Sequence, residues 1–197
     1  MNEKRHIIEA SKGIKPRLII LSDIDGFVKC EWIEKYISLL SDSFTIQLYD
    51  CRELGGVEFL NNSKDSIHKQ FIDNGFDKAV SKLIELETGI IYVLAFSIGG
   101  TIAWKSMLLG LKVNKMIAIS STRLRFENEK PLSNIKLYFG ENDLYKPSID
   151  WFERLNVDFE FVKKSEHEVY KEMILFDRNV DIIKDAFCLD KNDSIKI

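Results

Sequence analysis

The sequence predicts an α/β fold with a mostly parallel central sheet of about six strands and helices on both faces. Short apolar runs, each long enough for one buried strand, alternate along the chain with longer stretches whose apolar residues recur at helical spacing. Strands that alternate with helices in this way form parallel sheets covered on both faces. Because the 197 residues contain no internal repeat and no shift in composition, we expect residues 1–197 to form one domain.

The N-terminal half begins with two expected strands and two expected helices. Residues 17–22 (RLIILS) form the apolar run of a buried strand, and residues 44–49 (FTIQLY) alternate as a second strand does. Between them, residues 30–40 place aromatic and aliphatic side chains at helical spacing. Residues 66–87 continue with a long helical pattern, which Asn74-Gly75 can interrupt.

The rest of the chain repeats the alternation. Residues 90–96 (IIYVLAF) are the most strand-like run in the sequence, and we expect a helix over residues 101–109 directly after them. The remaining expected elements are strands at residues 113–120, 135–139 and 158–163 and helices at residues 147–155 and 169–187. These strands bring the expected sheet to six.

Composition excludes several classes of function. The 28 Lys and Arg residues are outnumbered by 31 Asp and Glu, for a net charge of −3, so the basic surface of a nucleic-acid-binding protein is not expected. No apolar run approaches the roughly 20 residues of a membrane-spanning helix, and residues 1–15 lack the apolar run of a signal peptide. Cys30, Cys51 and Cys188 form neither a disulfide framework nor a zinc motif. We therefore expect a cytoplasmic protein without a metal or organic cofactor, and its oligomeric state stays open.

The turn after the strand at residues 90–96 contains the strongest candidate for catalysis. Ligands of an open parallel sheet bind beyond the carboxyl ends of its strands. Ser97 stands there, between a strand and a helix, and Ala95 and Gly99 on either side are small enough for the two backbones to approach closely. Such a turn holds the serine hydroxyl clear of the sheet, and the Ile98 N–H at the helix start can stabilise an oxyanion.

These residues resemble the α/β-hydrolase superfamily, whose nucleophile turn has the pattern G-x-S-x-G, with Ala95 here in place of the first glycine. Residues 140–147 (GENDLYKP) fit the family's G-x-x-D-x-x-x-P pattern, and Asp143 is its acid. His167 follows the last strand, so Ser97, Asp143 and His167 stand in the family's order. The resemblance extends from about residue 17 to the C-terminal helix. It implies a small serine hydrolase without a lid domain, in which the first strands of the family sheet are shortened or absent.

The resemblance also implies a role for each of these residues. His167 would take the proton of Ser97, and Asp143 would orient the imidazole and stabilise its charged form. The expected reaction is therefore the cleavage of an ester or thioester through an acyl-enzyme, with a small-molecule acyl compound as the substrate.

Other residues near strand ends are candidates for binding. The N–H groups of Ile98 and Ile24 are the expected oxyanion hole, and Phe27 and Tyr145 are expected to contact substrate. The loop after the strand at residues 113–120 contains two arginines, which can meet a substrate carboxylate or phosphate but for which we expect solvated surface positions; they are Arg123 and Arg125. The remaining histidines, His6 and His68, are expected to face solvent.

Two alternatives remain open. Residues 19–26 (IILSDIDG) resemble the D-x-D-G motif of the haloacid dehalogenase-like phosphatases, which would make Asp23 a nucleophile and Asp25 a general acid beside Mg²⁺. The hydrolase hypothesis requires instead that both aspartate side chains point away from the developing oxyanion. The second alternative is a non-catalytic protein that keeps the hydrolase fold as a binding module.

Overall fold

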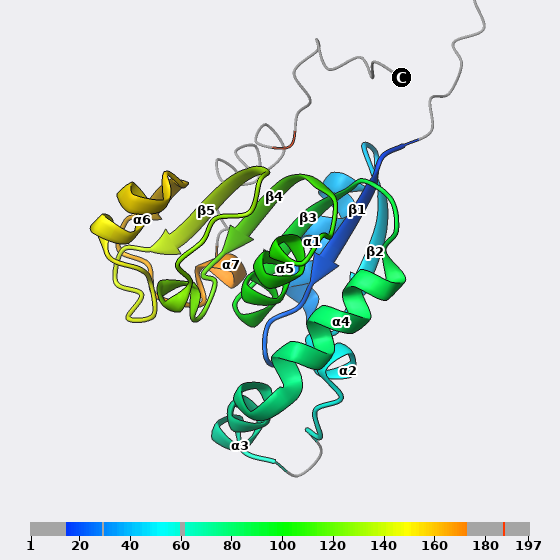
Figure 1. Cartoon of the computed structure of the whole chain (residues 1–197), viewed down its shortest axis with the longest axis horizontal. Coiled ribbons are helices and arrows are strands. Elements are labelled where there is room, and N and C mark those ends of the chain that lie inside the picture. Colours follow the sequence, from blue (N-terminus) through cyan, green and yellow to red (C-terminus); the bar gives the residue numbers. More distant parts are fainter. Residues whose placement is uncertain (1–14, 29, 60–61, 173–186, 188–197) are drawn as a thin grey trace, which may run out of the picture.

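The centre of the molecule is a six-stranded sheet in which every neighbouring pair of strands runs parallel (Figure 1). This computed structural model describes residues 15–28, 30–59, 62–172 and 187. The strand order is β2-β1-β3-β4-β5-β6. The strands are β1 (Arg17–Leu21), β2 (Thr45–Tyr49), β3 (Ile91–Phe96), β4 (Val113–Ile119), β5 (Asn134–Gly140) and β6 (Asp158–Val162). The predicted fold class is confirmed, including the number of strands.

The central strand β3 illustrates why the sheet is covered on both faces. All six of its residues are buried, and successive side chains of a strand point to opposite faces. Val93 and Ala95 pack in an apolar core with residues of α2, α4 and α5, whereas Leu94 and Phe96 pack in a second core with residues of α1 and α7. Figure 1 shows α4 and α5 in front of the sheet and α1 behind it. A continuous apolar run is therefore the expected pattern for this strand.

Most of the helices agree with the sequence pattern, with one predicted helix interrupted and one helix not predicted. They are α1 (Glu31–Leu40), α2 (Cys51–Gly55), α3 (Lys64–Gln70), α4 (Phe76–Leu86), α5 (Ile98–Leu108), α6 (Ile149–Leu155) and α7 (Val169–Glu172). The helix predicted over residues 66–87 is interrupted before α4 by a π-helical turn, η1 (Phe71–Gly75), which contains Asn74-Gly75. Helix α2 was not predicted; the Asp50 side chain caps its start and Gly56 ends it in a left-handed conformation. Most of the helix predicted over residues 169–187 lies outside the described residues.

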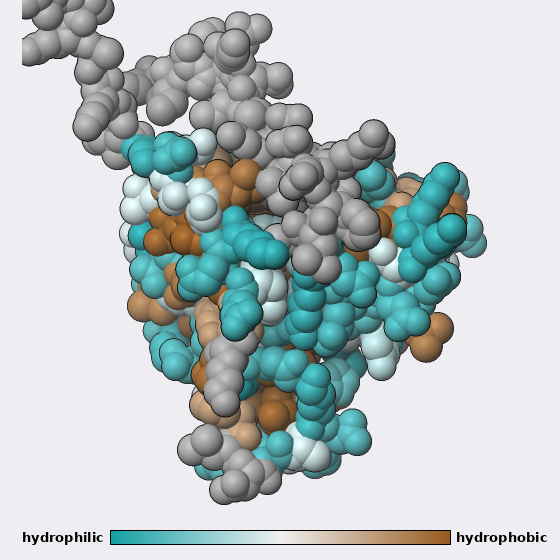
Figure 2. Space-filling view, turned by 180° about the vertical axis from the view of Figure 1, so that it is seen from behind, coloured by the Kyte–Doolittle hydropathy of each residue, from teal (hydrophilic) through white to brown (hydrophobic). Residues whose placement is uncertain are grey.

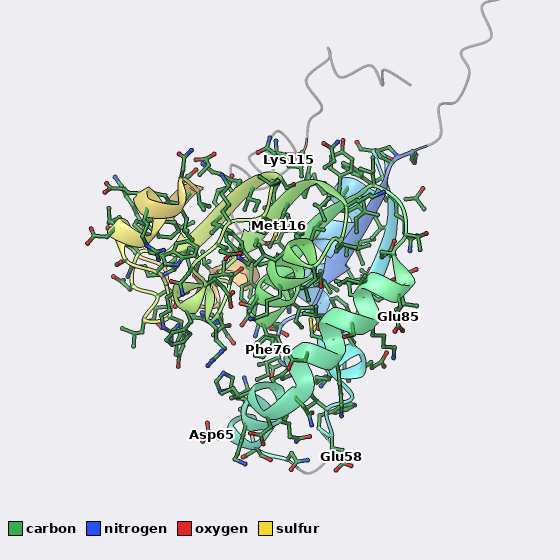
Figure 3. All side chains as sticks on the ribbon, viewed as in Figure 1. Glu58, Asp65, Phe76, Glu85, Lys115 and Met116 are labelled. Carbon is green, nitrogen blue, oxygen red and sulfur yellow. The ribbon has the colours of Figure 1, made fainter. Side chains whose placement is uncertain are left out.

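The two ends of the sheet differ in what lies beyond them. Figure 3 shows Asp65 of α3 beyond the carboxyl ends of the strands, while Lys115, near the start of β4, lies at the opposite end. On the face seen in Figure 2, hydrophilic residues surround smaller hydrophobic areas. Within the described residues, no helix combines the length and apolar character needed to cross a membrane. Cys30 and Cys51 are free thiols, and His6 and Cys188 lie outside the described part of the chain.

Candidate active site

Ser97 lies at the turn between β3 and α5 in a conformation that residues with a side chain rarely adopt. Its φ is 48° and its ψ is −117°. A positive φ at a residue other than glycine costs about 1–3 kcal/mol and is concentrated at functional sites. The Ser97 N–H donates a hydrogen bond to the Ile119 carbonyl at 3.0 Å, so the end of β4 holds the turn in place.

Gly99 allows α5 to lie directly against the end of β1. A Cβ atom at this position would lie 2.7 Å from the Ser22 carbonyl oxygen and 2.8 Å from the Leu21 Cβ, which leaves no space for a side chain. Ala95, on the other side of Ser97, is fully buried. The packing of helix against strand therefore requires glycine at position 99, and Ala95 fits within the buried strand.

The side chains of Ser97, His167 and Asp143 form a continuous chain of hydrogen bonds. Ser97 Oγ lies 3.1 Å from His167 Nε2, and His167 Nδ1 lies 2.9 Å from Asp143 Oδ2. The Asp143 side chain is fully buried, whereas that of His167 is 23% exposed. An imidazole that donates from Nδ1 to a carboxylate leaves Nε2 as the acceptor for a hydroxyl proton.

The loops after β5 and β6 bring Asp143 beside His167. A Cβ atom on Gly140 would lie 2.2 Å from the Glu166 carbonyl oxygen, so the two loops approach each other more closely than a side chain would permit. The Asn142 N–H donates to the Ser165 carbonyl at 2.9 Å, which ties the loops together. The Tyr145 N–H donates to Asp143 Oδ1 at 2.8 Å, so both oxygens of this carboxylate are occupied.

Thr122 is a site residue that the sequence analysis did not single out. Its hydroxyl oxygen lies 2.8 Å from Ser97 Oγ, and its N–H donates to the Ser97 carbonyl at 3.2 Å. The Thr101 hydroxyl donates in turn to the Thr122 carbonyl. Its position could have indicated this role. Thr122 lies two residues after the end of the strand predicted at residues 113–120, and that strand pairs with the one that leads to Ser97.

The carboxylate of Asp23 points away from Ser97 and into the protein. Asp23 is 1% exposed, and its Oδ2 accepts a hydrogen bond from the Tyr170 hydroxyl at 2.9 Å. Its Oδ1 accepts the Asp25 N–H at 3.0 Å. Burial raises the pKa of the Asp23 carboxyl, against the lowering effect of the hydrogen bond from Tyr170. Asp23 therefore shapes the loop that contains Ile24 instead of facing substrate.

Asp25 faces the site, but cations neutralise it. Its Oδ2 lies 3.0 Å from Lys64 Nζ and 3.8 Å from Lys171 Nζ. No group of three His, Cys, Asp or Glu side chains in the part of the chain that the structure describes is arranged to hold a metal ion. Of the two aspartates of the phosphatase hypothesis, Asp25 therefore faces the cavity, whereas Asp23, the expected nucleophile, is buried.

A cavity of about 300 Å³ opens above Ser97 and His167. Its walls are formed by the loops after β1, β3, β4, β5 and β6 together with α3, and consist of Ile24, Asp25, Lys64, Asp65, His68, Ser97, Ile98, Thr122, Tyr145, His167, Glu168 and Tyr170. A larger hollow of about 610 Å³, near Gly110 and Leu132, contains none of the expected site residues. Helix α3 lies beside the cavity, and no lid domain covers it among the described residues.

The structure brings most of the predicted binding residues to this cavity. Ile98 is the first residue of α5, so its N–H has no acceptor within the helix, and Ile24 lies on the facing loop. The Tyr145 ring meets the His167 ring edge-on, with centroids 5.2 Å apart. Phe27 does not line the cavity; it packs against the core beneath α1. His68, expected to face solvent, is a cavity residue because α3 folds back over the strand ends.

No family model matches the sequence, and no curated protein matches it. Solved structures do match its fold. A Xanthomonas campestris protein assigned to the alpha/beta superfamily of hydrolases is 12% identical, with a TM-score of 0.60 over 87% of this chain and 99% of that one. A predicted CIB-like hydrolase from Thermoplasma acidophilum is 16% identical, with a TM-score of 0.62 over 89% of each chain. A dienelactone hydrolase-like promiscuous phosphotriesterase from metagenomic libraries is 14% identical, with a TM-score of 0.62 over 81% of this chain and 74% of that one. The chain has the fold of the α/β-hydrolase superfamily.

Proposed function

We propose that the protein is a serine hydrolase that cleaves a carboxylic ester or thioester through an acyl-enzyme intermediate. One observation supports this most strongly: the hydrogen bonds of 3.1 and 2.9 Å that connect Ser97 through His167 to the buried Asp143. Both distances are within the reach that proton transfer requires. The strained backbone of Ser97 at the end of a buried strand supports the same role.

In the proposed reaction, His167 Nε2 removes the proton of Ser97 as Oγ attacks the acyl carbonyl carbon. Asp143 stabilises the imidazolium, and the N–H groups of Ile98 and Ile24 donate to the oxyanion. His167 then gives the proton to the departing alkoxide or thiolate, which leaves the acyl group on the serine. A water molecule that loses its proton to the same imidazole attacks this ester, releases the acid and restores the hydroxyl.

The surroundings of the site favour small acyl groups. A cavity of about 300 Å³ holds a short acyl chain, and the Tyr145 ring forms an apolar wall beside His167. This chemistry requires no metal or organic cofactor. We place the reaction in the cytoplasm, where free thiols such as those of Cys30 and Cys51 stay reduced.

Hydrolysis of 4-nitrophenyl acetate by the wild type and by Ser97→Ala tests the proposal. We expect the substitution to lower kcat/KM by about 10³-fold or more, because the nucleophile is lost. Ser106→Ala is the matched control: Ser106 is a buried serine of α5 whose hydroxyl donates to the Ile102 carbonyl at 2.8 Å. Equal rates in wild type and Ser97→Ala would overturn the proposal.

Two other results would point to the alternatives. A folded wild type that hydrolyses no ester would favour a non-catalytic binding protein. Mg²⁺-dependent hydrolysis of 4-nitrophenyl phosphate that is lost in Asp23→Asn would favour the phosphatase.

A further inference from the structure

The charged groups around the cavity are divided into two sets. On the side of α7 and the loop after β1, Asp25 contacts Lys64 at 3.0 Å, and Glu168 contacts Lys171 at 2.8 Å. Asp65 of α3 also lines the cavity and forms no ion pair with the described residues. On the side of the loop after β4, Arg123 and Arg125 have no carboxylate partner among the described residues. The protein itself therefore neutralises the cations on only one side.

The two arginines lie on the loop after β4, directly behind Thr122 of the cavity wall, and are not themselves among the residues that line the cavity. Both guanidinium groups lie over the ring of Phe126, at 4.9 Å for Arg123 and 4.5 Å for Arg125. The ring attracts each guanidinium group, whereas the two like charges repel each other. Both residues are partly exposed, so they lie at the surface but are not fully surrounded by solvent.

Each arginine is connected to a residue of the candidate active site. Arg125 Nη1 donates to the Tyr145 carbonyl at 2.9 Å, and its guanidinium lies 5.8 Å from the centre of the Tyr145 ring, which itself contacts His167. Arg123 directly follows Thr122, whose hydroxyl lies 2.8 Å from Ser97 Oγ. The φ of Arg123 is 72°, a left-handed conformation that costs energy for a residue with a long side chain.

The charge of both arginines reaches across the cavity to α3. Burial lowers the pKa of His68, a residue of the cavity wall, and the charges of Arg123 and Arg125 lower it further, while Asp65 acts in the opposite direction. His68 therefore senses the charge of both arginines, while Asp65 opposes it.

We propose that Arg123 and Arg125 bind a carboxylate carried by the acyl group of the substrate. The inference rests on the proposed function, and it narrows the substrate class to esters or thioesters of acids that have a second, free carboxylate. Guanidinium groups match the planar geometry of a carboxylate and form charge-assisted hydrogen bonds with it. Bound substrate would supply the counter-charge that the folded chain lacks on this side.

A pair of esters that differ only in charge tests the proposal. One is the mono-4-nitrophenyl ester of adipic acid with its carboxylate free, and the other is the same compound with that carboxylate capped as a methyl ester. Because the reacting ester and the leaving group are identical, the ratio of the two kcat/KM values isolates the effect of the charge. The variants are Arg123→Gln/Arg125→Gln, the charge-preserving Arg123→Lys/Arg125→Lys, and Arg154→Gln on exposed α6 as the control.

We expect the wild type and Arg154→Gln to favour the charged ester by roughly tenfold or more, mainly through a lower KM. The double glutamine variant should bring the ratio close to one, and the double lysine variant should retain part of the preference. A ratio near one in the wild type, or an unchanged ratio in the double glutamine variant, would overturn the proposal.

A binding measurement separates failure of this inference from failure of the proposed function. If both esters are hydrolysed equally, the proposed hydrolase activity is supported and the proposed carboxylate site is rejected. If neither ester is hydrolysed, calorimetry with monomethyl adipate decides. Binding by the wild type that the double glutamine variant loses would support the carboxylate site and reject the hydrolase activity. Absence of binding to the wild type would reject both proposals.

Discussion

Two turns meet at the cavity, and different contacts hold each of them in position. The turn after β3, residues 97–100, is fixed by backbone packing: Ser97 has a strained backbone, and Gly99 touches the end of β1. The acidic loop after β1, residues 22–27, is fixed from far along the chain, because the Tyr170 hydroxyl donates to the Asp23 carboxylate. Loss of the hydroxyl of Ser97 or of the base that serves it should therefore abolish the chemistry, whereas substitutions that only shift either turn should produce graded effects.

The largest effect is expected at the base that serves the first turn. His167→Ala removes the acceptor of the Ser97 proton, so kcat for 4-nitrophenyl acetate should fall by about 10³-fold. The matched control is His68→Ala, which removes the other histidine of the cavity wall and should cause a much smaller loss. Equal losses in the two variants would mean that Ser97 is not activated through His167.

The contact between the two turns can be broken at Gly99. In Gly99→Ala the new methyl group would lie 2.7 Å from the Ser22 carbonyl oxygen, which should push α5 and the acidic loop apart. We expect a loss of stability of about 1–3 kcal/mol and a loss of up to about 10² in kcat/KM from misplacement of Ser97. Gly89→Ala is the control, because nothing lies within 4 Å of its new Cβ. Denaturant unfolding and ester hydrolysis measure both effects, and similar behaviour of the two variants would contradict this account.

The long-range support of the acidic loop can be tested at Tyr170. Tyr170→Phe leaves the buried Asp23 carboxylate without its hydroxyl donor, which should cost about 1–3 kcal/mol of stability. It should also lower kcat/KM by up to roughly tenfold, because the loop with Ile24 loses its hydrogen bond to α7 and keeps only the contacts of Lys171 with Asp23 and Asp25, at 3.7 and 3.8 Å. Tyr36→Phe removes a buried hydroxyl that donates to the Tyr170 carbonyl at 2.8 Å and should reduce stability with little effect on catalysis. An unchanged kcat/KM in Tyr170→Phe would show that the acidic loop needs no such support.

The smallest expected effect is the pH dependence of stability. Burial raises the pKa of Asp23 above its ordinary value of 3.8, so the folded protein binds this proton more tightly than the unfolded chain. The contribution of Asp23 to the free energy of unfolding is therefore fully present below pH 3.8 and declines as the pH rises through the folded pKa. Urea unfolding of the wild type and Asp23→Asn at several pH values measures this. As the pH rises, the free energy of unfolding of the wild type should decrease relative to that of Asp23→Asn. An increase relative to the variant would contradict the conclusion that burial dominates the pKa of Asp23.

The sequence predicted what depends on local pattern. The six strands, the small residues around Ser97 and the chain order of Ser97, Asp143 and His167 follow from periodicity and short motifs, because buried strands and tight turns restrict the residues within them. The sequence could not decide which way Asp23 points, because its partner Tyr170 lies 147 positions away. The placement of His68 was missed because the helical pattern over residues 66–87 does not show that the chain divides at the π-helical turn η1, nor that α3 lines the cavity at the strand ends.

The predicted binding residues show the same limit of prediction from local sequence. Phe27 and Tyr145 both follow strand ends, yet only Tyr145 reaches the cavity. The direction of a side chain in an irregular loop depends on backbone angles and neighbours that no short motif encodes. Proximity to a strand end therefore predicts the edge of the sheet at which a residue lies, but not the surface that it faces.

The central claim is that Ser97 is a nucleophile activated by His167. Peptide mass spectrometry after treatment with a fluorophosphonate tests this most directly, because the probe forms a stable adduct only with an activated serine. We predict a single adduct on the peptide that contains Ser97, formed rapidly in the wild type and far more slowly in His167→Ala. An adduct on another residue, or equally fast labelling of Ser97 without His167, would contradict the claim.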